Sequence, residues 1–253
     1  METKEIIGRN PVLEYLRALG ERSGGELFVS KSAHGKIIDT IVREAKQRGV
    51  KITWCEKDLL AKIDSSSRHQ GVMLRLPSRA RSPREEDFLE EVAAVSGLIV
   101  ALDRLSDPHN VGSIIRSAEA LGASGAVLSK AHSADITPVV VKASAGATAH
   151  LPILTVSNIA QFLERAKSRG FWIIGASGEG RSSPEDVAEV RPAVLVIGSE
   201  GEGMRRLTEH KCDYMVRIPL KGNIESLNAS VAAGILLYEL LKSSPKTKTK
   251  YVE

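Results

Sequence analysis

Three segments of the chain, 103–112, 197–204 and 218–230, combine polar side chains with glycine or proline turns after runs of apolar residues. Such a pattern is typical of a buried strand that ends in a loop. Ligands of open α/β sheets bind at the carboxyl ends of the strands, so these segments are where the sequence places its chemistry. Glycine turns let a ligand approach the backbone closely, and a helix that begins after such a turn favours an anion.

The first segment predicts a helix over 108–121. Asp107 is a suitable N-cap and Pro108 a suitable first helical residue. Arg116 falls outside the apolar stripe and can point away from the core; an i,i+3 pair with Glu119 on a solvated face is an equally good interpretation. Asn110, in the first turn, is compatible with a site or with local backbone binding. The apolar stripe consists of Val111, Ile114, Ile115, Ala118 and Leu121.

The second segment places three glycines after the apolar run 193–197, in the order GxxGxG. This differs from the GxGxxG of dinucleotide-binding folds, and no GxxxxGK[ST] occurs in the chain. A nucleotide-dependent oxidoreductase and a nucleoside triphosphatase are therefore poorly supported.

The third segment leads into an almost wholly apolar helix predicted over 226–242. Ser226 is a candidate N-cap and Asn228 a second capping group, which would explain both residues without a function. Small residues gather in this helix and suit very close packing, including packing against a second subunit. They are Ala229, Ala232, Ala233 and Gly234.

Strand and helix patterns alternate from residue 93 to 243, which predicts a mostly parallel sheet with helices on both faces. Residues 1–76 predict a smaller α/β/α/β unit that includes a short helix over 57–63, with Asn10 as a candidate cap of the first helix. The stretch 77–92, with two prolines and an acidic run, predicts a linker, and 244–253 predicts a basic tail.

Composition favours a cytoplasmic α/β protein of 253 residues. The chain has no apolar run long enough for a membrane span, no apolar signal segment at its start and only two cysteines, so neither a membrane partner nor a metal site is expected. Residues 1–84 hold 17 Lys and Arg against 10 Asp and Glu, a balance of +7, whereas 85–241 hold 14 against 20, a balance of −6. A basic first third indicates a polyanionic partner, although an ordinary solvated basic surface explains the same charge.

Together, DPHNVGSIIRSAEALGA, VIGSEGEGM and IPLKGNIESLNASVAAGILLYE resemble the three ordered motifs of the SpoU (TrmH-type) RNA 2′-O-ribose methyltransferases. The resemblance runs from Gly97 to Leu241. It implies an α/β SPOUT fold with a trefoil knot, S-adenosylmethionine as cofactor and a homodimer.

The N-terminal sequences GRNPVLEYLRA and RHQGVMLRLP resemble the ribosomal-protein-like RNA-binding domain of the bacterial 23S rRNA (guanosine-2′-O-)-methyltransferases. Ribosomal RNA is therefore the expected partner. Antibiotic-resistance methyltransferases of the ribosome share this two-domain plan and stay an alternative, as does a non-catalytic RNA-binding protein.

The resemblance also implies site residues. Gly198, Ile218 and Leu227 would contact the cofactor, largely through backbone groups. The remaining family positions are polar and would form the active site, with Arg116 at the target nucleotide and with Glu200 orienting Arg116 or Asn110. These active-site residues are Asn110, Arg116, Glu200, Ser226 and Asn228.

Overall fold

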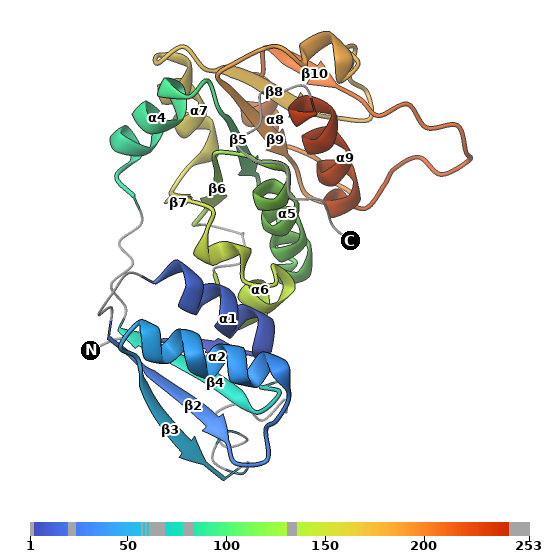
Figure 1. Cartoon of the computed structure of the whole chain (residues 1–253). Coiled ribbons are helices and arrows are strands. Elements are labelled where there is room, and N and C mark those ends of the chain that lie inside the picture. Colours follow the sequence, from blue (N-terminus) through green and yellow to red (C-terminus); the bar gives the residue numbers. More distant parts are fainter. Residues whose placement is uncertain are drawn as a thin grey trace. The chain divides into compact units, whose positions relative to one another are not determined.

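The computed structural model describes residues 3–19, 24–56, 58, 60, 69–77, 83–130 and 136–242 (Figure 1). The chain folds into two compact units that each draw on several segments. The first comprises Met1–Pro83, Asp107–Arg116 and Ala134–Pro152, and the second comprises Arg84–Ser106, Ser117–Ser133 and Ile153–Glu253. Among the described residues, no helix is both long and apolar enough to cross a membrane.

A four-stranded mixed sheet with the order β1-β4-β2-β3 forms the first unit. Strand β4 is antiparallel to both β1 and β2, whereas β2 and β3 are parallel. Strand β1 was not predicted, because a segment of five residues with two charges, TKEII, shows no clear strand pattern. The predicted helix over 57–63 lies mostly outside the described residues. The strands are β1 (Thr3–Ile7), β2 (Glu26–Ser30), β3 (Lys51–Cys55) and β4 (Val72–Pro77).

Two helices, α1 (Arg9–Ala18) and α2 (Lys36–Gln47), pack on this sheet. Helix α2 buries Ile38, Ile41 and Ala45, which are spaced three and four residues apart and form one face. The prediction that Asn10 caps α1 is wrong, because the N-cap is Gly8, whose φ of 97° favours glycine.

A segment of the predicted methyltransferase domain also belongs to the first unit. It contains α6 (Pro138–Ala143) and the 3₁₀ helix η1 (Ala147–Ala149). Val141 joins the hydrophobic core of the first unit, and the Tyr15 hydroxyl lies 2.9 Å from Oγ1 of Thr148. Deleting residues 1–84 would therefore remove apolar cover from α6 and η1, so point substitutions test the first unit more cleanly than truncation does.

A six-stranded, fully parallel sheet with the order β10-β8-β9-β5-β6-β7 forms the second unit. The strands are β5 (Leu98–Leu102), β6 (Gly125–Ser129), β7 (Ile153–Val156), β8 (Trp172–Ala176), β9 (Ala193–Ile197) and β10 (Tyr214–Val216). All residues of β5, β6 and β9 are buried, as expected for strands covered on both faces.

Helices α4 (Glu85–Ala94) and α7 (Ile159–Lys167) bury their apolar residues in one core cluster with alternate residues of the strands, such as Ile99 and Ala101. Because side chains alternate along a strand, Leu98 and Val100 face the opposite side of the sheet. Helix α9 (Ala229–Leu241) lies on that side in Figure 1. The predicted parallel sheet with helices on both faces is confirmed.

Helix α4 occupies the second half of the predicted linker 77–92. Its first turn holds Glu85, Glu86 and Asp87, which suit the positive end of the helix dipole, and Phe88, Leu89 and Val92 are buried. The helix was not predicted, because the acidic run interrupts the apolar periodicity.

Candidate active site

Strands β10, β8 and β9 are neighbours in the sheet, and their carboxyl ends bring three loops side by side. Two backbone hydrogen bonds join the loops after β8 and β10, from N of Ser177 to O of Val216 at 2.9 Å and from N of Arg217 to O of Ser182 at 3.1 Å. A Cβ on Gly180 would lie 2.6 Å from the backbone carbon of Val216, so the two loops touch through a glycine. The loop after β8 was not predicted as part of the site.

The glycine-rich loop after β9 folds back on itself. Backbone N–H groups of Ser199 and Gly203 each donate to the other residue's carbonyl at 3.0 Å. Gly201 and Gly203 have φ values of 84° and 68°, a conformation that favours glycine. A Cβ on Gly198 would lie 2.3 Å from the backbone carbon of Gly203, so no other residue fits there without a shift. Gly198 therefore allows two parts of this loop to approach each other closely, and the approach of a ligand to this backbone stays a prediction.

A buried carboxylate anchors the far end of this loop. Asp103 directly follows β5 and is fully buried. Its Oδ2 accepts a hydrogen bond from the backbone N of Arg205 at 3.1 Å. Its Oδ1 accepts one from Nε of Arg205 at 2.9 Å and lies 2.7 Å from a terminal nitrogen of the same guanidinium. This pair was not predicted from the sequence. A charge placed directly after a buried strand was the only available signal.

Glu200 joins the glycine loop to the start of α9. Its Oε1 accepts a hydrogen bond from the Asn228 side-chain amide at 2.6 Å and another from the backbone N of Ala229 at 3.2 Å. Asn228 is the N-cap of α9, with its Oδ1 accepting from the backbone N of Ser230 and of Val231. The prediction that Ser226 caps this helix is wrong, because α9 begins three residues later. The structure thus brings the glycine-rich loop, with Gly198 and Glu200, into hydrogen-bond contact with Asn228 at the start of α9.

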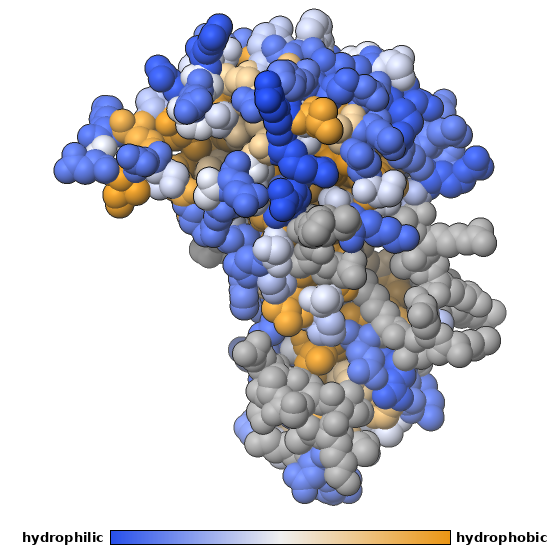
Figure 2. All heavy atoms as spheres, turned by 180° about the vertical axis from the view of Figure 1, so that it is seen from behind, coloured by the Kyte–Doolittle hydropathy of each residue, from blue (hydrophilic) through white to orange (hydrophobic). Residues whose placement is uncertain are grey.

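The remaining predicted residues of the third segment lie on the irregular loop 217–228. Ile218 is half-buried, Ser226 is exposed and Leu227 is 37 % exposed. Leu220 and Ile224 are exposed as well, and Figure 2 shows hydrophobic side chains on the surface of the projecting segment at its left edge. Such open apolar side chains suit contact with a ligand or a partner.

Asn110 and Arg116 lie on α5 (Pro108–Leu121), in the part of this helix that belongs to the first unit. Oδ1 of Asp107 accepts a hydrogen bond from the backbone N of His109 at 2.9 Å, which confirms the predicted cap. Asn110 is buried and Arg116 is exposed, opposite the buried stripe. No ion pair of Arg116 occurs among the described residues, so the alternative pair with Glu119 is absent there.

The two cysteines offer no activated thiol. Burial raises the pKa of the Cys212 thiol to about 12, and burial also raises the pKa of Cys55. A thiol must lose its proton to act as a nucleophile, so neither cysteine suits covalent catalysis near neutral pH. Across the part of the chain that the structure describes, no group of three or more His, Cys, Asp and Glu is placed to hold a metal ion.

S-adenosylmethionine, the cofactor implied by the sequence resemblance, fits the open loop 217–228. Among the described residues, no hydrogen bond uses the backbone N–H or C=O groups of 218–227. Backbone groups of this kind can recognise an adenine edge, and the exposed side chain of Leu227 offers apolar contact beside them. These backbone groups and Leu227 are therefore compatible with an adenosine-containing ligand.

Two family models match the chain. The SpoU rRNA Methylase family matches residues 97–238, and the RNA 2′-O ribose methyltransferase substrate binding family matches residues 6–80. Among individual proteins, YacO of Bacillus subtilis, assigned to the TrmH family of tRNA/rRNA methyltransferases, is 37 % identical over 94 % of this chain and 94 % of its own length.

Solved structures of SpoU-type enzymes are also similar to this chain. The SpoU methyltransferase AviRb from Streptomyces viridochromogenes, solved in complex with the cofactor AdoMet, matches 95 % of this chain and 89 % of its own, with a TM-score of 0.76 and 27 % identity. The TrmH/SpoU tRNA modifying enzyme of A. aeolicus matches 62 % of this chain and 83 % of its own, with a TM-score of 0.52 and 31 % identity.

Proposed function

Because the chain belongs to the SpoU rRNA methylase family, we propose that it methylates the ribose 2′-hydroxyl of a guanosine in 23S ribosomal RNA. It is an S-adenosylmethionine-dependent RNA 2′-O-ribose methyltransferase. The narrower substrate rests on one observation, the RNA substrate-binding region at residues 6–80 within the basic first third of the chain. The tRNA-modifying enzyme of A. aeolicus leaves more than a third of this chain unmatched, and this difference favours a ribosomal RNA substrate over a tRNA substrate.

In the proposed site, one group of residues binds the cofactor and a second group positions the target nucleotide. When bound, S-adenosylmethionine supplies a methyl group that is already activated on a sulfonium. The backbone of Gly198, Ile218 and Leu227 would hold its adenosine. The chain must then align the ribose hydroxyl with that methyl group, and positioning of this kind is a large part of catalysis.

Arg116 is the residue we assign to the target nucleotide. Its exposed guanidinium can bind a phosphate and stabilise negative charge that develops on the ribose oxygen. Arginine is a poor proton acceptor in proteins, so we do not assign Arg116 as the base. Glu200 is a positioning residue in this proposal, since its carboxylate holds the Asn228 amide and the first N–H of α9. Asn110 and Ser226 complete the proposed polar site, and contact of Glu200 with Asn110 or Arg116 stays a prediction.

Mapping of 2′-O-methyl groups tests the proposed substrate. We expect 23S ribosomal RNA from cells that lack the gene to lose one methylated guanosine, which the wild-type gene restores. Purified protein should transfer labelled methyl groups to 23S ribosomal RNA but not to 16S ribosomal RNA or tRNA. A methylated tRNA, or a methylated nucleoside other than guanosine, would overturn the corresponding part of the proposal. A change in antibiotic sensitivity without loss of a resident methyl group would favour the resistance-type enzyme.

We also propose a homodimer built on α9, within the knotted, cytoplasmic enzyme that the family resemblance implies. Val231, Ile235 and Tyr238 are 50, 38 and 56 % exposed and follow one another at helical spacing. The opposite face of α9 is buried in its own subunit. An exposed apolar stripe of this kind suits an isologous contact with a second copy.

Replacing Ile235 by glutamate should therefore convert the dimer into a monomer, because a charge would be buried in the apolar contact. Light scattering at micromolar concentration measures the mass directly. The matched control is Leu207→Glu, which places the same charge on an exposed leucine of α8 (Arg206–Glu209). A wild-type monomer, or a dimer that survives Ile235→Glu, would refute this interface.

A further inference from the structure

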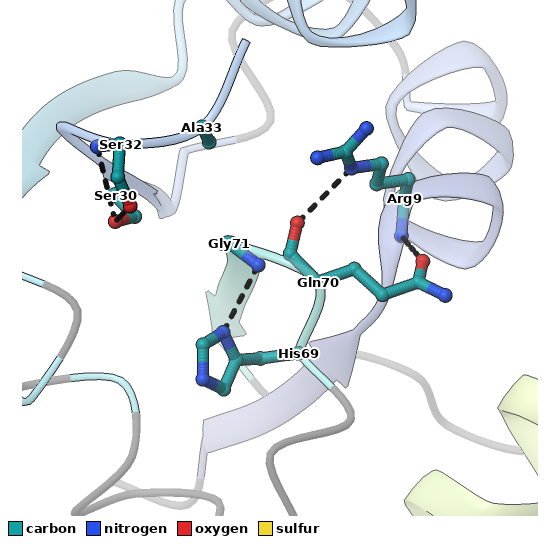
Figure 3. Close-up of a pocket in the computed structure, with 7 residues that line it drawn as sticks. All are labelled: Arg9, Ser30, Ser32, Ala33, His69, Gln70 and Gly71. Atoms are coloured by element: carbon teal, nitrogen blue, oxygen red, sulfur yellow. Dashed lines mark hydrogen bonds between the residues drawn. The ribbon is translucent and has the colours of Figure 1, made fainter.

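A polar pocket of about 490 Å³ lies in the first unit, between the start of α1, the end of β2 and the turn before β4 (Figure 3). Ligand pockets typically measure roughly 300–1,000 Å³, so the volume is enough for one nucleotide. The polar residues and the glycine of its lining are Arg9, Ser30, Ser32, His69, Gln70 and Gly71. None of them belongs to the methyl-transfer site proposed above.

The turn that forms one wall is held in a conformation that costs energy. Gln70 and Gly71 have φ values of 50° and 83°, and a Cβ on Gly71 would lie 2.8 Å from that of Ala33. The backbone N of Gly71 donates to Nδ1 of His69 at 3.0 Å, and its carbonyl accepts from the backbone N of Ser30 at 2.8 Å. His69 itself is almost fully buried. Strained turns that the surroundings hold this firmly cluster at ligand sites.

Arg9 is fixed against this turn by its inner nitrogens. Its backbone N donates to Oε1 of Gln70 at 3.1 Å, and its Nε donates to the Gln70 carbonyl at 3.0 Å. The structure shows no ion pair of Arg9 with any described residue. Figure 3 shows its two terminal nitrogens extended toward the side of the pocket where Ser32 and Ala33 lie. A guanidinium held in this way presents a pre-oriented pair of donors, which matches the geometry of a phosphate.

The charge and polarity of the lining favour an anion. The lining residues include no carboxylate, and the Ser30 and Ser32 hydroxyls, 2.9 Å apart, can donate or accept. Helix α1 begins at the pocket, where the positive end of its dipole adds to the charge of Arg9. Residues 1–84 as a whole carry 17 Lys and Arg against 10 Asp and Glu.

We infer that this pocket holds one unpaired nucleotide of the RNA substrate, with its phosphate on the terminal nitrogens of Arg9. The polar edges of the nucleotide would lie against Ser30, Ser32 and Gln70. Proteins that recognise RNA sequence read unpaired nucleotides, while phosphate contacts set the register of the strand. The inference rests on the proposed function, and it gives the first unit a specific contact in addition to its general positive charge.

Two substitutions in the full chain test the pocket, each lowering the net charge by one. Arg9→Gln removes the paired donors, and Ser32→Glu places a carboxylate in the pocket without touching the contacts of Arg9. The matched control is Arg17→Gln, which removes an exposed positive charge from the same helix, where Arg17 pairs with Glu14 at 2.8 Å. RNA affinity is measured over a salt series, with S-adenosylmethionine affinity by calorimetry and thermal unfolding beside it.

We expect Arg9→Gln and Ser32→Glu to weaken binding of a 23S ribosomal RNA fragment at least ~10-fold, the order of one lost charged contact. Arg9→Gln should also lower the log–log salt slope by about 0.7, the value for one contact to a single-strand phosphate. Arg9→Lys keeps the positive charge but lacks the paired donors of the guanidinium. It should therefore retain the salt slope of RNA binding while the affinity for RNA falls. Arg17→Gln and the cofactor affinities should stay near wild type.

The inference fails if folded Arg9→Gln and Ser32→Glu bind RNA as the wild type does, or if Arg17→Gln weakens binding equally. Should Arg9→Gln not fold, Ser32→Glu decides alone, because Ser32 is exposed. Failure of the proposed function looks different, since the wild-type protein would then methylate no ribosomal RNA at all.

Discussion

The variant Arg116→Ala should transfer methyl groups at least ~10²-fold more slowly than the wild type, with an almost unchanged affinity for S-adenosylmethionine. Removing one donor that stabilises charge in a transition state typically costs about 10²–10³ in kcat. Arg116 is exposed on α5, and its loss leaves the buried stripe of that helix intact. The protein should therefore fold normally, and calorimetry should detect wild-type cofactor binding.

Single-turnover rates with saturating RNA separate this effect from weaker substrate binding. Glu119→Ala is the matched control, because Glu119 is exposed on the same helix three residues away. Arg116→Lys should recover part of the rate, since it restores the charge without the planar fork. A purified Arg116→Ala enzyme that turns over normally would contradict the assignment.

Local patterns predicted the elements that carry this site. Continuous apolar runs identified β5 and β9, and the Asp107-Pro108 pair marked the start of α5, where Oδ1 of Asp107 indeed accepts from the N of His109. These features depend on neighbours within a few residues, which a sequence displays directly. Helix α4 was not predicted, because its charged first turn obscured the apolar pattern that begins with the buried Phe88 and Leu89.

Contacts between distant residues could not be predicted in the same way. Asp103 and Arg205 lie 102 positions apart, and nothing in either local sequence indicates the other. Ser226 was predicted as the N-cap of α9 and Asn228 as a second capping group, whereas in the structure Asn228 is the N-cap and its amide also contacts Glu200, 28 positions away. The packing of Val141 in the core of the first unit is equally non-local, because its apolar run resembles any other buried helix.

The buried pair between Asp103 and Arg205 leads to the second large effect. Asp103→Ala should lower the free energy of unfolding by about 2–3 kcal/mol, less than for a fully buried pair because Arg205 is 35 % exposed. It should also weaken S-adenosylmethionine binding at least ~10-fold, by analogy with the loss seen when a hydrogen bond that orients a metal ligand is removed. The physical reason is that Asp103 holds both the backbone N and the side chain of Arg205, where the glycine-rich loop ends.

Urea unfolding and calorimetry measure the two quantities on the same preparations. Asp103→Asn keeps an oxygen that can accept from the backbone N of Arg205 but loses the charge, so it should fall between Asp103→Ala and the wild type. Glu202→Gln provides the control, because Glu202 pairs with Arg104 at 3.2 Å in the same loop but is 74 % exposed. An exposed pair of this kind contributes roughly 0–1 kcal/mol. If folded Asp103→Ala bound the cofactor as tightly as the wild type, the glycine-rich loop would not depend on this anchor, and the proposed path from Asp103 through Arg205 to the cofactor would be refuted.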